Sequence, residues 1–181
     1  MSLQIITVVK RYFLSNKDIK ELSNAVGELG PVFRSAKKVE VYELNETTTV
    51  YLIDDKPLVA KLTIKVDSGQ REYIIPLLTY FYLNPPYIPS YPTVTVDDGA
   101  VPHIVNGADV MRPGIKEISG NFGVGDVLLI KDLKGRYIAI GGVSLMTTDE
   151  MRSTSKGKVI KVIHHLGDKI WNLAQELLKA K

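Results

Sequence analysis

The sequence of 181 residues contains no cysteine and only three histidines. Without cysteine the chain cannot form a disulfide, a thiolate metal site or a thiol nucleophile. No two histidines have the H-x-x-x-H or H-E-x-x-H spacing of common zinc sites, so we expect no metal and no cofactor. The nucleophile-elbow and Walker-type phosphate-loop motifs are missing as well. These absences predict a protein that is not an enzyme.

Excess charge is also scarce, because 23 basic and 20 acidic residues leave a net charge of +3. A chain with so little excess charge is not expected to bind every polyanion tightly. No basic segment followed by an apolar run opens the sequence, so a signal peptide is not indicated, and we expect a cytoplasmic protein.

Residues 73–96 carry no charge and are long enough to span a membrane. Five of the nine prolines lie within this segment, at positions 76, 85, 86, 89 and 92. Proline lacks the backbone N–H that a membrane helix requires, so we expect a short helix over residues 76–83 followed by a stiff connector. Pro85-Pro86-Tyr87 is compatible with a ligand for a proline-binding groove or with a strap between two domains.

This connector divides the sequence into an expected first domain, 1–91, and an expected second domain, 92–181. The first has the pattern of a small α+β unit. A strand-like run at 3–9 precedes a helix that Ser15 or Asn16 caps and that Gly30-Pro31 ends. Strand patterns follow at residues 39–44, 50–52 and 62–66. We expect an antiparallel sheet with one face exposed to solvent.

The second domain has many short strand patterns separated by glycine turns, which is typical of a small β-barrel with helical plugs. Strands are predicted at residues 93–96, 127–130, 137–141 and 159–163, with an interrupted extended segment at 109–118. Short helices are predicted at 101–105 and after a cap at Thr147 or Thr148. Asp168 is expected to cap a terminal helix with one apolar stripe.

Four aspartates, Asp54, Asp55, Asp97 and Asp98, are the candidate acids for a small-molecule site between the halves. Asp97 and Asp98, however, lie at a strand-to-helix turn, where carboxylates usually cap backbone N–H groups. We therefore favour a capping role for this pair. The glycine-rich segment 120–125 precedes a strand pattern rather than a helix, so it does not fit a phosphate-binding loop.

Two features favour binding of a polyanion. Arg152, Lys156, Lys158 and Lys161 occur in a segment without any acid, although a solvated surface explains this run equally well. Glycines also frame a short strand that ends at Arg112, whose planar cation suits phosphate or base edges. Taken alone, this second feature is better explained by ordinary turn chemistry.

Residues 96–115 contain the strings Val-Asp-Asp-Gly-Ala and Gly-Ala-Asp-Val-Met-Arg-Pro-Gly. They resemble the signature of the PUA domain, in which a D-x-G-A turn leads to a short helix and then to a G-A-x-hydrophobic-M-x-P-G strand. Weaker similarity continues in order to residue 172. With its α+β first half, proline- and tyrosine-rich bridge and terminal helix, the whole layout resembles the malignant-T-cell-amplified-sequence family and its archaeal relatives.

This resemblance implies an α+β fold: an N-terminal pre-PUA domain with an antiparallel sheet, and a C-terminal mixed β pseudobarrel with short helices and a terminal helix. It also implies a non-enzymatic RNA-binding protein of translation, which acts in initiation, re-initiation or recycling. Its partners would be rRNA or tRNA, the small ribosomal subunit and a translation-factor protein, with neither DNA nor a membrane expected.

Carried over by position, the resemblance assigns nine residues to an RNA-binding surface: Gly99, Ala100, His103, Gly107, Met111, Pro113, Gly114, Lys156 and Lys158. We add Arg112 and Arg152 from their charge. Three alternatives stay open: an accessory RNA-binding subunit of a tRNA- or rRNA-modifying enzyme, a small-molecule enzyme, and a protein-interaction scaffold that uses the N-terminal sheet.

Overall fold

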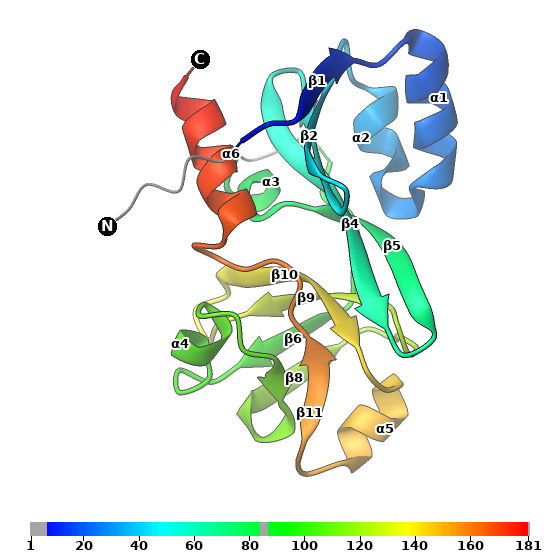
Figure 1. The fold of residues 1–181 in the computed structure, drawn as a ribbon. Helices are drawn as coiled ribbons and strands as arrows, with labels where there is room; N and C mark the ends of the chain where they lie inside the picture. The colour runs from blue at the N-terminus through cyan, green and yellow to red at the C-terminus, as the bar shows by residue number, and fades with distance from the viewer. Residues whose placement is uncertain (1–6, 84–86, 181) are drawn as a thin grey trace. The chain divides into compact units, whose positions relative to one another are not determined.

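The computed structural model describes residues 7–83 and 87–180, and its contacts divide the chain into two units (Figure 1). The first unit runs to Pro89 and includes the segment from Asn172 onward, and the second runs from Ser90 to Trp171. This grouping differs from the predicted division at residue 91 chiefly in the terminal helix. The predicted pair of domains stays a prediction about how the chain divides.

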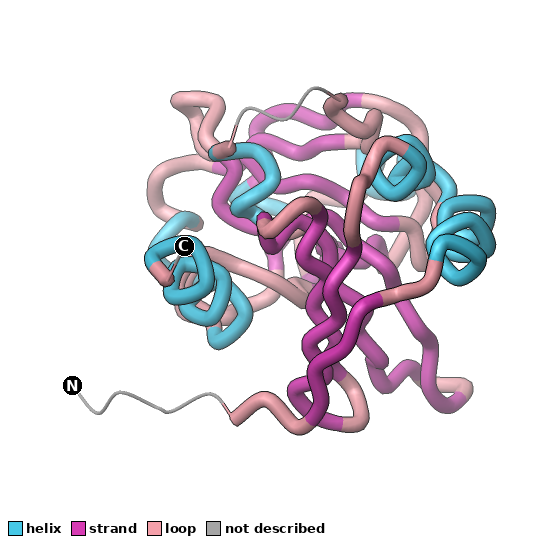
Figure 2. The backbone as a smooth tube through the Cα atoms, turned by 90° about the horizontal axis from the view of Figure 1, so that it is seen from above, coloured by secondary structure: helices cyan, strands magenta, loops and turns pink. Residues whose placement is uncertain are grey.

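The first unit contains a five-stranded antiparallel sheet whose order follows the sequence. Its strands are β1 (Lys10–Phe13), β2 (Val39–Asn45), β3 (Thr48–Ile53), β4 (Lys56–Val66) and β5 (Gly69–Pro76). The helical segments are α1 (Asn16–Ala25), η1 (Gly27–Leu29), α2 (Gly30–Arg34) and α3 (Leu78–Tyr82). Helices α1 and α2 lie side by side against one face of the sheet (Figures 1 and 2).

The start of the first helix is confirmed and its predicted end is wrong. The Ser15 hydroxyl accepts a hydrogen bond from the Asp18 N–H at 3.1 Å, as expected of an N-cap. Gly30-Pro31, however, begins α2 instead of ending the preceding helix. Proline fits the first turn of a helix because its missing N–H would have no partner there.

The strand predictions for this unit are partly corrected. Residues 3–6 of the expected strand at 3–9 lie outside the described residues, residues 7–9 form no strand, and the observed strand β1 begins at Lys10. Strand β5 was not expected because its first half is polar and exposed, yet it pairs with β4 from Gly69 to Pro76. The short helix α3 is slightly shorter than the predicted 76–83.

The expectation of one solvent-exposed sheet face is wrong for the centre of this sheet. Neighbouring residues of β3 point to opposite faces, and Val50, Tyr51, Leu52 and Ile53 are all buried. The run Val-Tyr-Leu-Ile is continuously apolar, which is the pattern of a strand covered on both faces.

The second unit contains a mixed six-stranded sheet in the order β7-β11-β10-β9-β6-β8. Its strands are β6 (Thr93–Val96), β7 (Val110–Met111), β8 (Ile115–Ser119), β9 (Val127–Lys131), β10 (Tyr137–Ser144) and β11 (Lys158–Lys161). Strands β6 and β9 are parallel, whereas the other pairs are antiparallel. The predicted mixed β architecture is therefore confirmed.

The two edge strands of this sheet, β7 and β8, are joined by the three-residue turn η2 (Arg112–Gly114). Four Cα steps separate Met111 from Ile115, which limits their separation to about 14 Å. The short turn therefore brings the two sheet edges together and closes the strands into a pseudobarrel. Its interior is filled by apolar residues such as Val94, Leu128 and Ile160.

Three helices complete the chain after the connector: α4 (Val101–Ile104), α5 (Thr148–Ser153) and α6 (Lys169–Lys179). Thr147 and Glu150 form a capping box at α5, which confirms Thr147 as the cap. The Asp168 carboxylate accepts the Trp171 N–H at 2.8 Å, as expected of a cap on α6. Across residues 7–83 and 87–180, every helix is too short or too polar to cross a lipid bilayer.

Candidate functional site

The turn from β6 into α4 is held by Asp97. Its Oδ1 accepts the Ala100 N–H at 2.9 Å, which confirms for Asp97 the predicted role of binding a backbone N–H at this turn. The Asp97 N–H donates in turn to the Gly114 carbonyl at 2.8 Å. Asp97 thus fixes the start of α4 against the end of η2. Lys116 lies 3.8 Å from the other carboxylate oxygen.

The exit from α4 depends on Gly107, whose φ of +93° lies in the left-handed region. Its N–H donates to the Ile104 carbonyl, and the Ala108 N–H donates to the His103 carbonyl, both at 3.0 Å. These bonds occupy carbonyls that the end of a helix leaves without intrahelical partners. The chain can then turn sharply into β7.

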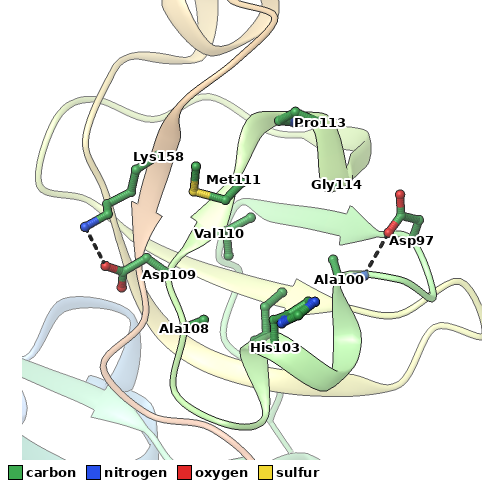
Figure 3. Close-up of a pocket in the computed structure, with 11 residues that line it drawn as sticks. Asp97, Ala100, His103, Ala108, Asp109, Val110, Met111, Pro113, Gly114 and Lys158 are labelled. Atoms are coloured by element: carbon green, nitrogen blue, oxygen red, sulfur yellow. Dashed lines mark hydrogen bonds and ion pairs between the residues drawn. The ribbon is translucent and has the colours of Figure 1, made fainter.

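A pocket of about 630 Å³ lies between α4, the β7–η2 segment and β11 (Figure 3). This is within the range of about 300–1,000 Å³ that is usual for ligand pockets. Most of its lining is apolar, and the apolar residues are Ala100, Ile104, Ala108, Val110, Met111 and Pro113. The polar residues are Asp97, His103, Asp109 and Lys158. The pocket therefore combines an apolar surface with a few charged groups.

Gly114 lies where two walls of the pocket meet. A Cβ atom at this position would lie 3.0 Å from the Ala100 Cβ, closer than side-chain carbons normally approach. Glycine therefore lets the η2 turn pack directly against the start of α4. This contact gives a physical reason for the glycine of the Met-Arg-Pro-Gly string.

Lys158 and Asp109 form an ion pair at the edge of the pocket, with Nζ and Oδ2 3.0 Å apart (Figure 3). The other oxygen of Asp109 accepts the Val162 N–H at 2.9 Å. The Lys158 side chain remains 54% exposed, whereas that of Asp109 is 25% exposed. Asp109 thus holds the ammonium group in place while leaving it accessible to an incoming anion.

Two family models match the sequence: the PUA domain at residues 92–166, and a domain of unknown function, DUF1947, at residues 10–81. The uncharacterized protein MJ1432 of Methanocaldococcus jannaschii is 34% identical over 167 residues, covering 90% of this chain and 96% of that protein. The chain belongs to the family of PUA-domain proteins with an N-terminal DUF1947 domain. The resemblance seen in the sequence is therefore confirmed.

Other relatives connect this family to named proteins. Translation machinery-associated protein 20 of Saccharomyces cerevisiae is 29% identical over 167 residues, covering 88% of this chain and 84% of that protein. A probable tRNA pseudouridine synthase B of Nanoarchaeum equitans is 28% identical over 147 residues, which are 80% of this chain but 40% of that protein. The PUA domain itself supports RNA binding as the general function of the second unit.

Solved structures agree with the fold. The hypothetical protein PH0734.1 of Pyrococcus horikoshii OT3 has a TM-score of 0.71 and 34% sequence identity. The match covers 91% of this chain and 99% of that chain, so it includes both the DUF1947 domain and the PUA domain.

The pocket of the PUA domain brings together six of the predicted site residues: Ala100, His103, Met111, Pro113, Gly114 and Lys158. Five predicted residues do not line it: Gly99, Gly107, Arg112, Arg152 and Lys156. Of these, Arg152 and Lys156 are exposed, at the end of α5 and in the turn before β11. Their contact with RNA stays a prediction.

Arg112 has a structural role that the sequence reasoning missed. Its Nε donates to the Met151 carbonyl at 2.6 Å, and its Nη1 donates to the Ile115 carbonyl at 3.3 Å. Its backbone N–H donates to the Gly157 carbonyl at 2.8 Å. Arg112 thus ties α5, the start of β8 and the Lys156–Lys158 turn to the wall of the pocket. Its predicted contact with RNA is not tested by these bonds.

Five pocket residues were absent from the predicted site: Asp97, Ile104, Ala108, Asp109 and Val110. Three of them lie inside the Gly-Ala-Asp-Val-Met string, so the string itself was the available signal. Asp109 is the only acid in that string, and an acid in a domain with an acid-free basic run at residues 152–161 could have suggested an ion pair. Asp97 was considered as a candidate acid and as a cap, but not as part of the RNA-binding surface.

A second group of polar residues in the second unit surrounds the buried His164. The His164 side chain is 1% exposed, and its Nδ1 lies 2.8 Å from Asp168 Oδ2. Burial alone would raise the pKa of Asp168, but hydrogen bonds from His164 and from the N–H groups of Trp171 and His165 outweigh it, so its pKa is lowered. No group of three or more acidic or histidine residues suited to a metal ion occurs in the described part of the chain.

Proposed function

We propose that this protein is a non-enzymatic RNA-binding protein of translation that contacts small-subunit rRNA or tRNA through its PUA domain. The observation that carries the proposal is the pocket at the seam of the pseudobarrel, which has an apolar lining and the exposed Lys158 at its edge. An apolar surface can pack against a base or a ribose, while the ammonium group of a lysine at the edge can bind a phosphate.

The cations around this pocket support contact with a nucleotide backbone. Lys158 lies at the pocket edge, and Lys156 lies two residues before it in an exposed turn. Gly157, between them, has a φ of +91° and has open space where a side chain would lie. A phosphate can therefore approach the backbone closely between two ammonium groups.

The net charge of +3 sets the mode of binding. A few cations neutralise few phosphates, so nonspecific affinity for RNA should be weak. We therefore propose that the protein recognises an exposed part of a structured RNA by shape, and that the small ribosomal subunit and a translation-factor protein supply further contacts. The similarity to a yeast protein named for association with the translation machinery supports this setting, and with it the cytoplasm as the place of action.

The alternative function is that of an accessory RNA-binding subunit of a tRNA- or rRNA-modifying enzyme. The observation that favours it is the similarity to a probable tRNA pseudouridine synthase B. In that case a catalytic chain would copurify with this protein. Two of the four candidate acids for an activity of its own are engaged in the fold, since Asp54 accepts two backbone N–H groups and Asp97 accepts the Ala100 N–H.

Ultraviolet crosslinking in native lysate, followed by sequencing of the attached RNA at two salt concentrations, tests the proposal. We expect small-subunit rRNA or tRNA, attached through residues 99–114 and 156–158. Precursor rRNA or tRNA together with a copurifying modification enzyme would favour the alternative. Absence of RNA above background at both salt concentrations would contradict both functions and leave the N-terminal sheet as the surface to test.

A further inference from the structure

The hairpin that joins β9 to β10, residues 132–136, is braced by one buried aspartate. The Asp132 side chain is 2% exposed, and its Oδ1 accepts the N–H groups of Lys134 and Arg136 at 3.0 and 2.9 Å. Its Oδ2 accepts the Arg136 Nε–H at 2.6 Å. The Gly135 N–H donates to the Asp132 carbonyl, and the Asp132 N–H donates to that of Arg136. This network gives the hairpin one fixed shape.

The same network places an apolar side chain in solvent between cations. Leu133 is 54% exposed at the tip of the hairpin, and Lys134 and Arg136 are exposed beside it. At the base of the hairpin, the Lys131 ammonium lies 4.9 Å from the centre of the Tyr137 ring. The apolar surface of Leu133 is therefore available to a partner, and its burial against that partner would be favourable.

The topology places this hairpin at the same end of the sheet as the pocket. Strands β6 and β9 are parallel neighbours, with Thr95 beside Lys131, so both end at the same edge. Strand β6 continues into the Asp97–Ala100 turn, which borders the pocket, and β9 continues into the hairpin. A ligand that fills the pocket and extends past this turn therefore runs toward the hairpin.

We propose that the β9–β10 hairpin is a second RNA contact, which packs against the helical part of an RNA whose unpaired part occupies the pocket. This inference rests on the proposed RNA-binding function. Helical RNA has a wide and shallow minor groove lined by ribose groups and flanked by phosphates. Leu133 packs on the ribose surface, while Lys134 and Arg136 contact the phosphates on either side.

The charge between the two contacts limits how the RNA lies. Asp98 is exposed on the intervening turn and repels phosphates. The backbone therefore passes over this turn without resting on it. Two separated contacts, one for unpaired nucleotides and one for a helix, read the junction between them by shape. This adds selectivity for structured RNA without a large excess of positive charge.

Binding of two fluorescent RNA probes tests the inference. One probe is a stem-loop with a single-stranded 3′ extension, and the other is the extension alone. We expect Leu133→Ser to weaken binding of the stem-loop probe roughly fivefold, from the loss of part of one buried leucine. We expect Lys134→Ala to lower its salt slope by about one. Neither change should alter binding of the single-stranded probe.

Two substitutions serve as matched controls. Val124 is 64% exposed in the loop before β9, at the opposite end of that strand, so Val124→Ser should leave both affinities unchanged. Lys65 is exposed in β4 of the first unit, so Lys65→Ala controls for loss of one positive charge. In addition, Asp132→Asn weakens the hydrogen bonds that hold the hairpin but keeps its cations. It should weaken binding of the stem-loop probe and leave binding of the single-stranded probe unchanged.

The outcomes separate this inference from the function on which it rests. If the unmodified protein binds both probes and the hairpin variants bind them equally well, the hairpin contact is wrong while RNA binding stands. Equal losses for the two probes would also overturn a contact with the helical part. If the unmodified protein binds neither probe, the proposed function is contradicted and the hairpin contact with it.

Discussion

Two clusters in the second unit each contain a histidine and an aspartate but differ in exposure. In the first, His164 is buried beside Asp168, whose side chain is 16% exposed, and Asp168 accepts three hydrogen bonds. In the second, at the edge of the pocket, His103 is exposed and Lys158 keeps more than half of its side chain in solvent beside Asp109. Charge is used for folding in the first cluster and is available to a ligand in the second.

In a chain with little net charge, this difference in exposure distinguishes the residues that stabilise the fold from those that are available to bind RNA. A buried carboxylate must be matched by donors inside the protein, because its desolvation is costly. A half-exposed ion pair costs little to open, because water replaces its partner. Substitutions in the buried cluster should therefore change stability, and substitutions at the pocket edge should change RNA binding.

The largest expected effect is on stability, from Asp168→Ala. The substitution removes the cap of α6 and leaves the buried His164 ring without its carboxylate partner. We expect the free energy of unfolding to fall by about 2–4 kcal/mol. Urea denaturation followed by circular dichroism measures it. At urea concentrations below the denaturation midpoint, where the variant is folded, its RNA affinity should match that of the unmodified protein.

A change in the pocket wall should act mainly on binding. At Gly114→Val the new side chain meets Ala100, so the η2 turn must move away from α4. We expect RNA affinity to fall about tenfold or more, which corresponds to about 1.4 kcal/mol. The salt dependence should stay the same because no cation is removed. Fluorescence titration measures both quantities, and a proportionate smaller loss for Gly114→Ala would support the steric cause.

Low pH should lower the stability of the protein through the cluster of His164 and Asp168, with no substitution of a binding residue. The pKa of folded Asp168 is lowered below its ordinary value of 3.8, so its contribution to stability is complete above that value and disappears as the pH falls through the lower folded pKa. The unmodified protein should therefore lose stability more steeply than Asp168→Asn in the acid range. Denaturation from about pH 6 to about pH 3 measures the two slopes, and parallel curves would contradict this role for Asp168.

The smallest expected effect comes from Arg112→Lys, which keeps the charge but loses the planar guanidinium. Lysine cannot replace both bonds to the Met151 and Ile115 carbonyls. We expect a loss of stability of about 1 kcal/mol and a modest loss of RNA affinity, with an unchanged salt slope. Thermal denaturation and titration measure these quantities. Normal stability with strongly weakened binding would indicate that Arg112 contacts RNA directly.

The sequence was most informative for the PUA domain, where local signals and the fold agree. Asp97 accepts a backbone N–H in the turn before α4, Thr147 caps α5 and Asp168 caps α6, as their positions predicted. Capping depends on neighbours within a few residues, so one sequence is sufficient to detect it. The strand that carries Met111 and the turn at Pro113 were also predicted, because glycine and proline restrict local backbone geometry.

The errors arose where long-range pairing determines the result. Strand β5 is polar in its first half and forms because β4 offers a partner along its whole length. The second buried face of the first sheet and the hydrogen bonds of Arg112 to Met151 and Gly157 likewise join residues far apart in sequence. Local patterns cannot report such contacts. The pocket was therefore predicted only as separate pieces that closure of the pseudobarrel brings together.

The most direct test of the central claim is the salt dependence of RNA binding for the double variant Lys156→Ala, Lys158→Ala. The probe is the stem-loop with a single-stranded extension, and Lys65→Ala is the control for charge. If both lysines neutralise phosphates, the slope of log affinity against log salt should fall by up to about two, with little change in stability. An unchanged slope with a correctly folded double variant would remove both lysines from the RNA-binding surface and contradict the account.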